Sequence, residues 1–137
     1  MMAAESSAGP DHRARPLAVL VVEDDDELRA FLRAALEDDG FTVLAAPHGA
    51  AALALLRRHP RPDVVLLDLR LPVLDGAAFA RAFRRLPESD APLVVLTAAD
   101  DAGRRAAEVG AAALLRKPVD LDALLAVIRT HAAGKAA

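Results

Sequence analysis

A chain of 137 residues is long enough to close one hydrophobic core without disulfides, and we expect a single domain with no room for a second. The composition is 54% hydrophobic but only 3% aromatic, which favours an α/β protein built from Ala, Leu and Val over a β-sandwich. A net charge of −3 argues against a nucleic-acid or anionic-membrane surface, and the absence of cysteine excludes thiol chemistry.

The first part of the chain combines an aperiodic segment with a candidate strand. Residues 1–15 are rich in Ala, Ser, Gly and charge, and we expect a disordered leader there, not a signal peptide. The folded domain is expected to span residues 16–131. Within it, Leu17–Val22 is an apolar run bounded by charge, which is typical of a strand buried on both faces. No apolar run approaches the ~20 residues that span a bilayer, so we expect a cytoplasmic protein.

An acidic run, Glu23–Glu27, follows this strand and leads into a predicted helix. Apolar residues recur there at helical spacing, and Gly40 occupies the position of a C-cap. The next strand is predicted over Phe41–Ala46 and the next helix over Ala51–Arg58.

The most strongly patterned stretch is Val64–Asp68, in which four apolar residues are followed at once by a carboxylate. This pattern indicates a strand buried on both faces. A helix is predicted to begin after Asp75-Gly76, with Phe79 and Phe83 on one face. Because ligands bind at the carboxyl edge of open α/β sheets, we expect Asp68 to lie at a binding edge.

The last third of the chain repeats the strand and helix alternation. We predict a strand over Leu93–Thr97, a helix over Ala98–Val109, a short strand over Ala111–Leu115 and a final helix that Asp120 caps. Residues 132–137 are expected to form a frayed tail. Five strands that alternate with five helices imply right-handed crossovers, and therefore a doubly wound parallel sheet with helices on both faces.

Polar residues recur at the strand ends that share one edge of this sheet. They are Glu23, Asp24, Asp68, Thr97 and Lys117. Carboxylates that converge on one pocket repel one another unless a cation lies among them, and an all-oxygen site suits Mg²⁺. A carboxylate such as Asp68 can act as a nucleophile that forms an aspartyl phosphate, while Thr97 and Lys117 suit phosphoryl oxygens.

Each of these residues also has an ordinary structural explanation. The acidic run can stabilise a helix N-terminus, and Asp68 can cap a loop. Thr97 can be a β-branched strand end, and Lys117 can be solvent-exposed. These explanations do not account for the recurrence of all these side chains at one edge.

Four segments, taken in order, resemble the receiver domain of two-component response regulators. They are Val19–Asp25, Asp63–Pro72 with Asp75-Gly76, Leu93–Ala98 and Lys117-Pro118. The resemblance extends from about Leu17 to His131. It implies a flavodoxin-like five-stranded sheet of order 2-1-3-4-5, in which the first and third strands flank the topological switch point.

The resemblance implies a role for each matching position. Asp68 corresponds to the phospho-accepting aspartate, Asp24 to a direct Mg²⁺ ligand, and Glu23 to a ligand that acts largely through water. The backbone carbonyl of Arg70 completes the protein's share of the metal shell. The Lys117-Pro118 bond corresponds to a peptide bond that is usually cis in the family.

Two further positions match the family's switch machinery, and others depart from it. Thr97 resembles the hydroxyl that the phosphoryl group draws inward, and Lys117 the cation that contacts that group. Leu114 stands where most members have Tyr or Phe, so the usual aromatic switch is missing. Arg70 and Ala99 form an unusual pair at the positions that tune loss of the phosphoryl group, so the family does not predict its lifetime.

The implied function is Mg²⁺-dependent phosphorylation of Asp68 by a histidine kinase or a phosphotransfer protein. The protein is then expected to be a stand-alone receiver that signals by protein contact and catalyses only its own phosphorylation and dephosphorylation. The fourth helix, fifth strand and fifth helix form the expected output surface, which could also support a homodimer. We expect no direct binding of nucleic acid or membranes.

Two other functions stay open. A pseudo-receiver would keep the fold as a phosphorylation-independent interaction or dimerisation module, which the intact set of site residues argues against. A Mg²⁺-dependent phosphatase-type hydrolase would also use Asp68 as its nucleophile. That enzyme would need a second Asp two residues later as general acid, where this chain has Arg70.

Overall fold

The structure is a computed structural model that describes residues 16–59, 61–70, 75–87, 90–98 and 102–136. The predicted leader, residues 1–15, lies outside this part of the chain. None of the helices described here combines the length and the apolar character that a membrane span requires.

Five parallel strands form one sheet in the order β3-β2-β4-β5-β6. The strands are β2 Ala18–Val22, β3 Thr42–Ala46, β4 Val64–Asp68, β5 Leu93–Thr97 and β6 Ala113–Arg116. Counted along the chain, this order is 2-1-3-4-5, which confirms the predicted doubly wound sheet. The first and third strands of the chain, β2 and β4, lie side by side at the switch point.

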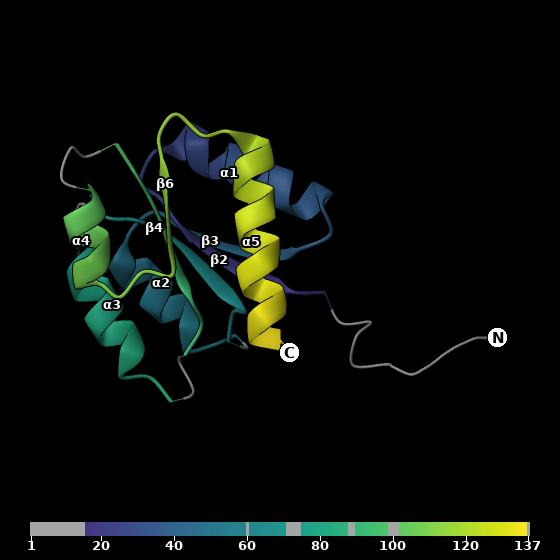
Figure 1. Cartoon of the computed structure of the whole chain (residues 1–137). Coiled ribbons are helices and arrows are strands. Elements are labelled where there is room, and N and C mark those ends of the chain that lie inside the picture. The colour runs from purple at the N-terminus through teal and green to yellow at the C-terminus, as the bar shows by residue number, and fades with distance from the viewer. Residues whose placement is uncertain (1–15, 60, 71–74, 88–89, 99–101, 137) are drawn as a thin grey trace.

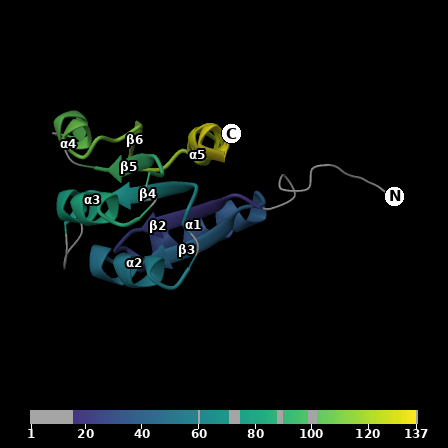
Figure 2. The same cartoon turned by 90° about the horizontal axis from the view of Figure 1, so that it is seen from below.

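Five helices cover the two faces of the sheet (Figure 1). They are α1 Asp26–Asp38, α2 Gly49–Leu56, α3 Gly76–Arg84, α4 Ala102–Glu108 and α5 Leu121–Ala136. Figure 2, a view turned by 90°, separates the layers: α1 and α5 lie on one face, and α2, α3 and α4 lie on the other.

The continuous apolar runs of the strands are explained by burial on both faces. In β4, Val65 and Leu67 join the core beneath α2, α3 and α4, whereas Val64 and Leu66 join the core beneath α1 and α5. Alternate side chains of a strand point to opposite faces, so a central strand has no solvent-facing side to mark with polar residues. The edge where the strands end is therefore built on strands that are packed on both faces.

Local side-chain hydrogen bonds decide where the helices begin. The carboxylates of Asp25, Asp75 and Asp120 accept hydrogen bonds from backbone N–H groups in the first turns of α1, α3 and α5. At the other end, Gly40 and Gly110 have positive φ of 100° and 68°, as expected of the residues that end α1 and α4.

Several boundaries differ from the sequence prediction. The helix α2 begins at Gly49, before the expected Ala51, because the His48 side chain accepts a hydrogen bond from the Ala51 N–H at 3.1 Å. The helix α4 covers only the later part of the predicted Ala98–Val109, of which residues 99–101 lie outside the described chain. The strand β6 is shifted to Ala113–Arg116 from the predicted Ala111–Leu115.

The end of the last helix also corrects the prediction of a frayed tail over residues 132–137. The helix α5 continues to Ala136, and Ala132 is fully buried in the core beneath α1 and α5. A row of small residues looks frayed when it is read locally. Burial of Ala132 favours the helix at this point, because burial of one face outweighs weak local preference.

Candidate functional site

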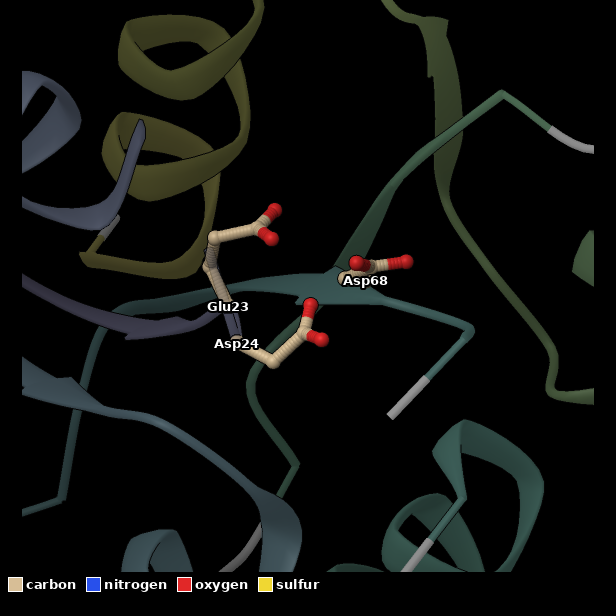
Figure 3. Close-up of side chains that lie close together, drawn as sticks. All are labelled: Glu23, Asp24 and Asp68. Atoms are coloured by element: carbon tan, nitrogen blue, oxygen red, sulfur yellow. The ribbon is translucent and has the colours of Figure 1, made fainter. Parts of the chain in front are cut away.

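The register of β2 and β4 brings two of the predicted site residues together. Val22 is the partner of Leu67, so the residues that follow them, Glu23 and Asp68, are neighbours across the sheet edge. Asp24 adds a third carboxylate, and one oxygen from each of the three groups lies within 4.8 Å of the others. Figure 3 shows these three side chains close together at the ends of β2 and β4.

The other two predicted residues come from β5 and the segment after β6. Thr97 ends β5 and is fully buried, and its backbone carbonyl accepts a hydrogen bond from the Lys117 N–H at 3.1 Å. Arg116, the last residue of β6, is the register partner of Thr97. The Lys117-Pro118 peptide bond is cis, as the resemblance implies.

Lys117 bridges the two buried carboxylates. Its Nζ lies 3.2 Å from Oδ2 of Asp68 and 3.1 and 3.3 Å from Oε1 and Oε2 of Glu23. The side chains of Glu23 and Asp68 are only 2% and 4% exposed, whereas Asp24 faces solvent. The site therefore has a buried floor that carries a cation and an open side that carries a carboxylate.

The buried carboxylates of Glu23 and Asp68 repel each other. Burial, together with the charge of Asp68, raises the pKa of Glu23 to about 7, although hydrogen bonds from the Asp25 N–H and from Lys117 oppose the rise. Burial alone would lower the pKa of Lys117, but its bonds to Glu23 and the charge of Asp68 raise it instead. Lys117 is therefore held as a cation, while its single charge does not balance the carboxylates around it.

One oxygen of the cluster lacks a hydrogen bond. Oε1 of Glu23 is buried and is the only such side-chain atom without a hydrogen-bond partner in the described residues, since Lys117 is well aligned only with Oε2. A buried carboxylate oxygen without a hydrogen bond is costly, although the charge of Lys117, 3.1 Å away, offsets part of this cost. Three converging carboxylates are the donor set that a hard divalent cation prefers, so the residues present fit Mg²⁺.

The acidic run after β2 divides between two roles. Glu23 and Asp24 face the site, whereas Asp25 caps α1 and Asp26 pairs with Arg29 at 2.6 Å. The helix-stabilising explanation of the run is therefore correct for its later residues. The site and the helix are also joined, because the Asp25 N–H donates to Oε2 of Glu23 at 3.1 Å.

The remaining predicted residues lie close to the site or one layer behind it. The Arg70 N–H donates to Oδ1 of Asp68 at 2.9 Å, so Arg70 fixes the orientation of this carboxylate. Leu114 of β6 lies opposite Val95 of β5. It is partly buried and packs against the core beneath α2, α3 and α4. Leu114 therefore belongs to the packing between the sheet and the helices α2, α3 and α4.

Sequence reasoning missed two arginines that brace the site. Arg29 of α1 donates to the Glu23 carbonyl at 2.9 Å, and Arg105 of α4 donates to the Leu69 carbonyl at 3.4 Å. Nothing in the periodicity of either helix distinguishes these arginines from solvated ones. Their roles depend on how far each side chain reaches across to another element.

Gly76, the first residue of α3, allows close packing next to the predicted acceptor. A Cβ at this position would lie 2.8 Å from the Leu69 Cα, and Leu69 directly follows Asp68. We expect Gly76→Ala to displace this backbone, to destabilise the fold by roughly 1–3 kcal/mol and to slow phosphorylation. Urea unfolding and the rate of phosphoryl uptake would measure both effects.

Gly103→Ala is the matched control for this prediction. Gly103 is an exposed residue of α4, and a Cβ added there would meet nothing within 4 Å. Alanine should therefore leave phosphorylation unchanged and be neutral or slightly stabilising. Equal behaviour of the two variants would show that contact with Leu69 is unimportant.

Comparison with known proteins agrees with this geometry. The family model described as the response regulator receiver domain matches residues 19–129. The chain belongs to the response regulator receiver family. Receiver domains of two-component response regulators are phosphorylated on an aspartate, interact with histidine kinases and are not enzymes in the ordinary sense.

Curated relatives of this receiver are response regulators. The response regulator MprA of Mycobacterium sp. (strain KMS) is 41% identical over 116 residues, which cover 83% of this chain and 50% of that protein. The transcriptional regulatory protein CseB of Streptomyces coelicolor is 43% identical over 113 residues, which cover 81% of this chain and 47% of the relative. The chain thus spans about half the length of these proteins.

Solved receiver structures have the same fold. The chemotaxis protein CheY4 of Vibrio cholerae has a TM-score of 0.79 and 29% identity, covering 85% of this chain and 99% of that one. The receiver domain of the sensor histidine kinase PA1611 of Pseudomonas aeruginosa has a TM-score of 0.78 and 29% identity, covering 87% and 99%. The latter structure was determined with a magnesium ion coordinated in its active-site cleft.

Proposed function

We propose that this receiver accepts a phosphoryl group on Asp68 from a histidine kinase or a phosphotransfer protein, in a Mg²⁺-dependent step, and signals by protein contact. The observation that carries the proposal is the bridge formed by Lys117, whose Nζ lies within 3.2 Å of both buried carboxylates. A cation placed against the expected nucleophile neutralises charge where phosphoryl oxygens would arrive.

The chain's own groups divide the work of the transfer. One oxygen of Asp68 attacks phosphorus as the bond to the donor's leaving atom breaks, and the donor keeps that electron pair. The Arg70 N–H, 2.9 Å from Oδ1, holds the carboxylate in one orientation, which reduces the entropy lost in reaching the transition state. We expect Lys117 and Thr97 to contact the transferred group.

Magnesium would be held by Glu23, Asp24, Asp68 and the backbone carbonyl of Arg70. When bound, Mg²⁺ supplies positive charge that neutralises phosphoryl oxygens and relieves repulsion among the carboxylates. Oε1 of Glu23 supports this assignment, because it is buried without a hydrogen bond and pairs only by charge with Lys117, 3.1 Å away, so it can bind the metal or one of the metal's waters.

Intact mass spectrometry tests the proposal directly. The protein incubated with a small-molecule phosphodonor and Mg²⁺ should gain the mass of one phosphoryl group, and a chelator should prevent the gain. A protein that stays unmodified under these conditions, and also with histidine kinases supplied, would instead be a phosphorylation-independent interaction module.

The apolar Leu114 should limit the conformational response to phosphorylation. Burying a leucine side chain contributes roughly 1.5–3 kcal/mol. The Leu114 side chain is therefore expected to point into the core in both the unphosphorylated and the phosphorylated protein. A tyrosine at this position can leave its hydroxyl in water, so its side chain can also point outward toward solvent. We therefore expect Leu114→Tyr to enlarge the phosphorylation-dependent chemical-shift changes over α4, β6 and α5.

Leu114→Phe separates the hydroxyl from ring size in this experiment. Phenylalanine has no polar group to keep in water, so its response should stay closer to that of the wild type. If the wild type already shows a large change on this face and Leu114→Tyr adds nothing, then Leu114 is only a packing residue.

A further inference from the structure

A groove of about 780 Å³ lies between α3 and α4, on the face of the sheet opposite α1 and α5. Its lining is built from small side chains, with Ala77 and Ala80 on α3 and Ala107 on α4. Small residues on both helices leave the space between them unfilled. Val109 and Gly110 close the end of the groove after α4.

The rim of this groove is basic although the whole chain carries a net charge of −3. Arg81, Arg84 and Arg85 line it from α3, and Glu108 is the one acidic residue in the lining. Arg84 is fixed in place, because its Nη1 donates to the Ala91 carbonyl at 2.9 Å and its guanidinium lies 5.5 Å from the centre of the Phe83 ring.

The exposed Arg81 and Arg85 have no acidic partner among the residues that the structure describes. Other arginines on exposed helix faces do pair: Arg33 with Glu37 on α1, and Arg129 of α5 with Asp39. Arginines in the last turn of α3 interact favourably with the negative end of the helix dipole, which accounts for positive charge at this place. The helix dipole does not explain why a groove lies beside these arginines.

The two helices that form the groove, α3 and α4, are both hydrogen-bonded to the same atom, the Leu69 carbonyl oxygen. It accepts a hydrogen bond from the Gly76 N–H at 3.3 Å, at the start of α3. It also accepts one from Nη2 of Arg105 at 3.4 Å, from α4. Since Leu69 directly follows Asp68, a shift of this backbone would change the spacing of the two helices.

We propose that the groove between α3 and α4 docks an acidic, partly apolar segment of a partner protein, and that the Leu69 carbonyl couples its affinity to the state of Asp68. The coupling rests on the proposed phosphorylation, whereas the docking does not. Carboxylates of the partner pair with Arg81 and Arg85, while small apolar side chains enter between the alanines.

The chemistry of the groove favours a protein segment over nucleic acid. Its floor is aliphatic and holds no aromatic ring on which a base could stack. The negative charge of the whole chain also opposes a polyphosphate backbone, whereas a short acidic helix needs only a local basic rim. Arginine suits such a contact because its planar guanidinium matches carboxylate geometry.

A designed peptide tests the docking on the unphosphorylated 137-residue chain. The probe is a labelled amphipathic helix with Glu on its polar face and Ala and Leu on the other, and binding is followed by fluorescence anisotropy. We expect saturable binding that becomes about tenfold weaker in the double variant Arg81→Gln/Arg85→Gln. The matched control Arg57→Gln/Arg58→Gln removes the same charge beyond the end of α2 and should bind as the wild type does.

Several outcomes would overturn the docking site. They are an absence of binding at millimolar peptide, an equal loss in the two double variants, and equal affinity for a peptide with Gln in place of Glu. Tighter binding of a DNA duplex than of the acidic peptide would identify the rim as a nucleic-acid surface. Melting temperatures of both double variants show whether any loss reflects unfolding.

The coupling is tested after phosphorylation is verified by intact mass. Peptide affinity should then change by about fivefold or more, and this change should be absent in Arg105→Ala when the two proteins are compared at equal extents of phosphorylation. Unchanged affinity in a verified phosphoprotein contradicts the coupling. Failure to take up phosphate contradicts the proposed function instead, and the binding of unphosphorylated protein still decides the docking site.

Discussion

Asp68→Asn should abolish covalent phosphorylation, so that intact mass shows no added phosphoryl group under conditions that modify the wild type fully. The amide has nearly the shape of the carboxylate but lacks the negative oxygen that attacks phosphorus. The backbone should change little, because the amide oxygen can still accept the Arg70 N–H that lies 2.9 Å from Oδ1. The loss therefore reports on chemistry, not on folding.

Asp75→Asn is the matched control for this variant. Asp75 carries the same change near the same edge of the sheet, where its carboxylate caps α3 by accepting from the Ala78 N–H at 2.8 Å. Asparagine caps a helix about as well as aspartate, so labelling should persist. If Asp68→Asn gains a phosphoryl group as readily as the wild type, another residue is the acceptor.

Asp24→Asn should remove detectable Mg²⁺ binding yet leave the metal-free protein at least as stable as the wild type. The three carboxylates converge within 4.8 Å, and like charges at that separation cost about 1 kcal/mol even when water screens them. Relief of this repulsion should raise the metal-free melting temperature by a few degrees. A carboxylate oxygen is also a far better Mg²⁺ ligand than an amide oxygen.

Calorimetry suits this measurement, because the chain has neither Trp nor Tyr to report binding by intrinsic fluorescence. Asp38→Asn, at the far end of α1, makes the same change at an exposed position outside the site and should leave Mg²⁺ affinity unaltered. A marked fall in the metal-free melting temperature of Asp24→Asn would show that Asp24 is a structural residue instead of a metal ligand.

The sequence alone determined the fold and the composition of the site edge. A strand buried on both faces is largely apolar, so the strand over Val64–Leu67, with Asp68 after it, and the strand Leu93–Thr97 could be assigned without a structure. In the structure β4 also includes Asp68, and β5 has the predicted bounds. Strict alternation of strands and helices then permits few topologies, because crossovers are right-handed. In a parallel sheet the carboxyl ends share one edge, which is why Glu23, Asp68 and Lys117 could be grouped in advance.

The tertiary structure decided how these groups act on one another. Only the register of β2 against β4 shows that Glu23 lies beside Asp68. Only the hydrogen bonds show that Asp25 caps α1 and that Oε1 of Glu23 is buried without a hydrogen bond. Lys117 reaches Glu23 across 94 positions of sequence. Periodicity describes neighbours along the chain, so it carries no information about such contacts.

The same limit explains the boundaries and the groove that sequence reasoning missed. Ala132 is helical because it is buried against the sheet, and Arg105 matters because it reaches the Leu69 carbonyl from another helix. The alanines of α3 and α4 look like ordinary helix formers in the sequence. They line a hollow only because the sheet sets the spacing of the two helices, and that spacing follows from the packing of the whole core.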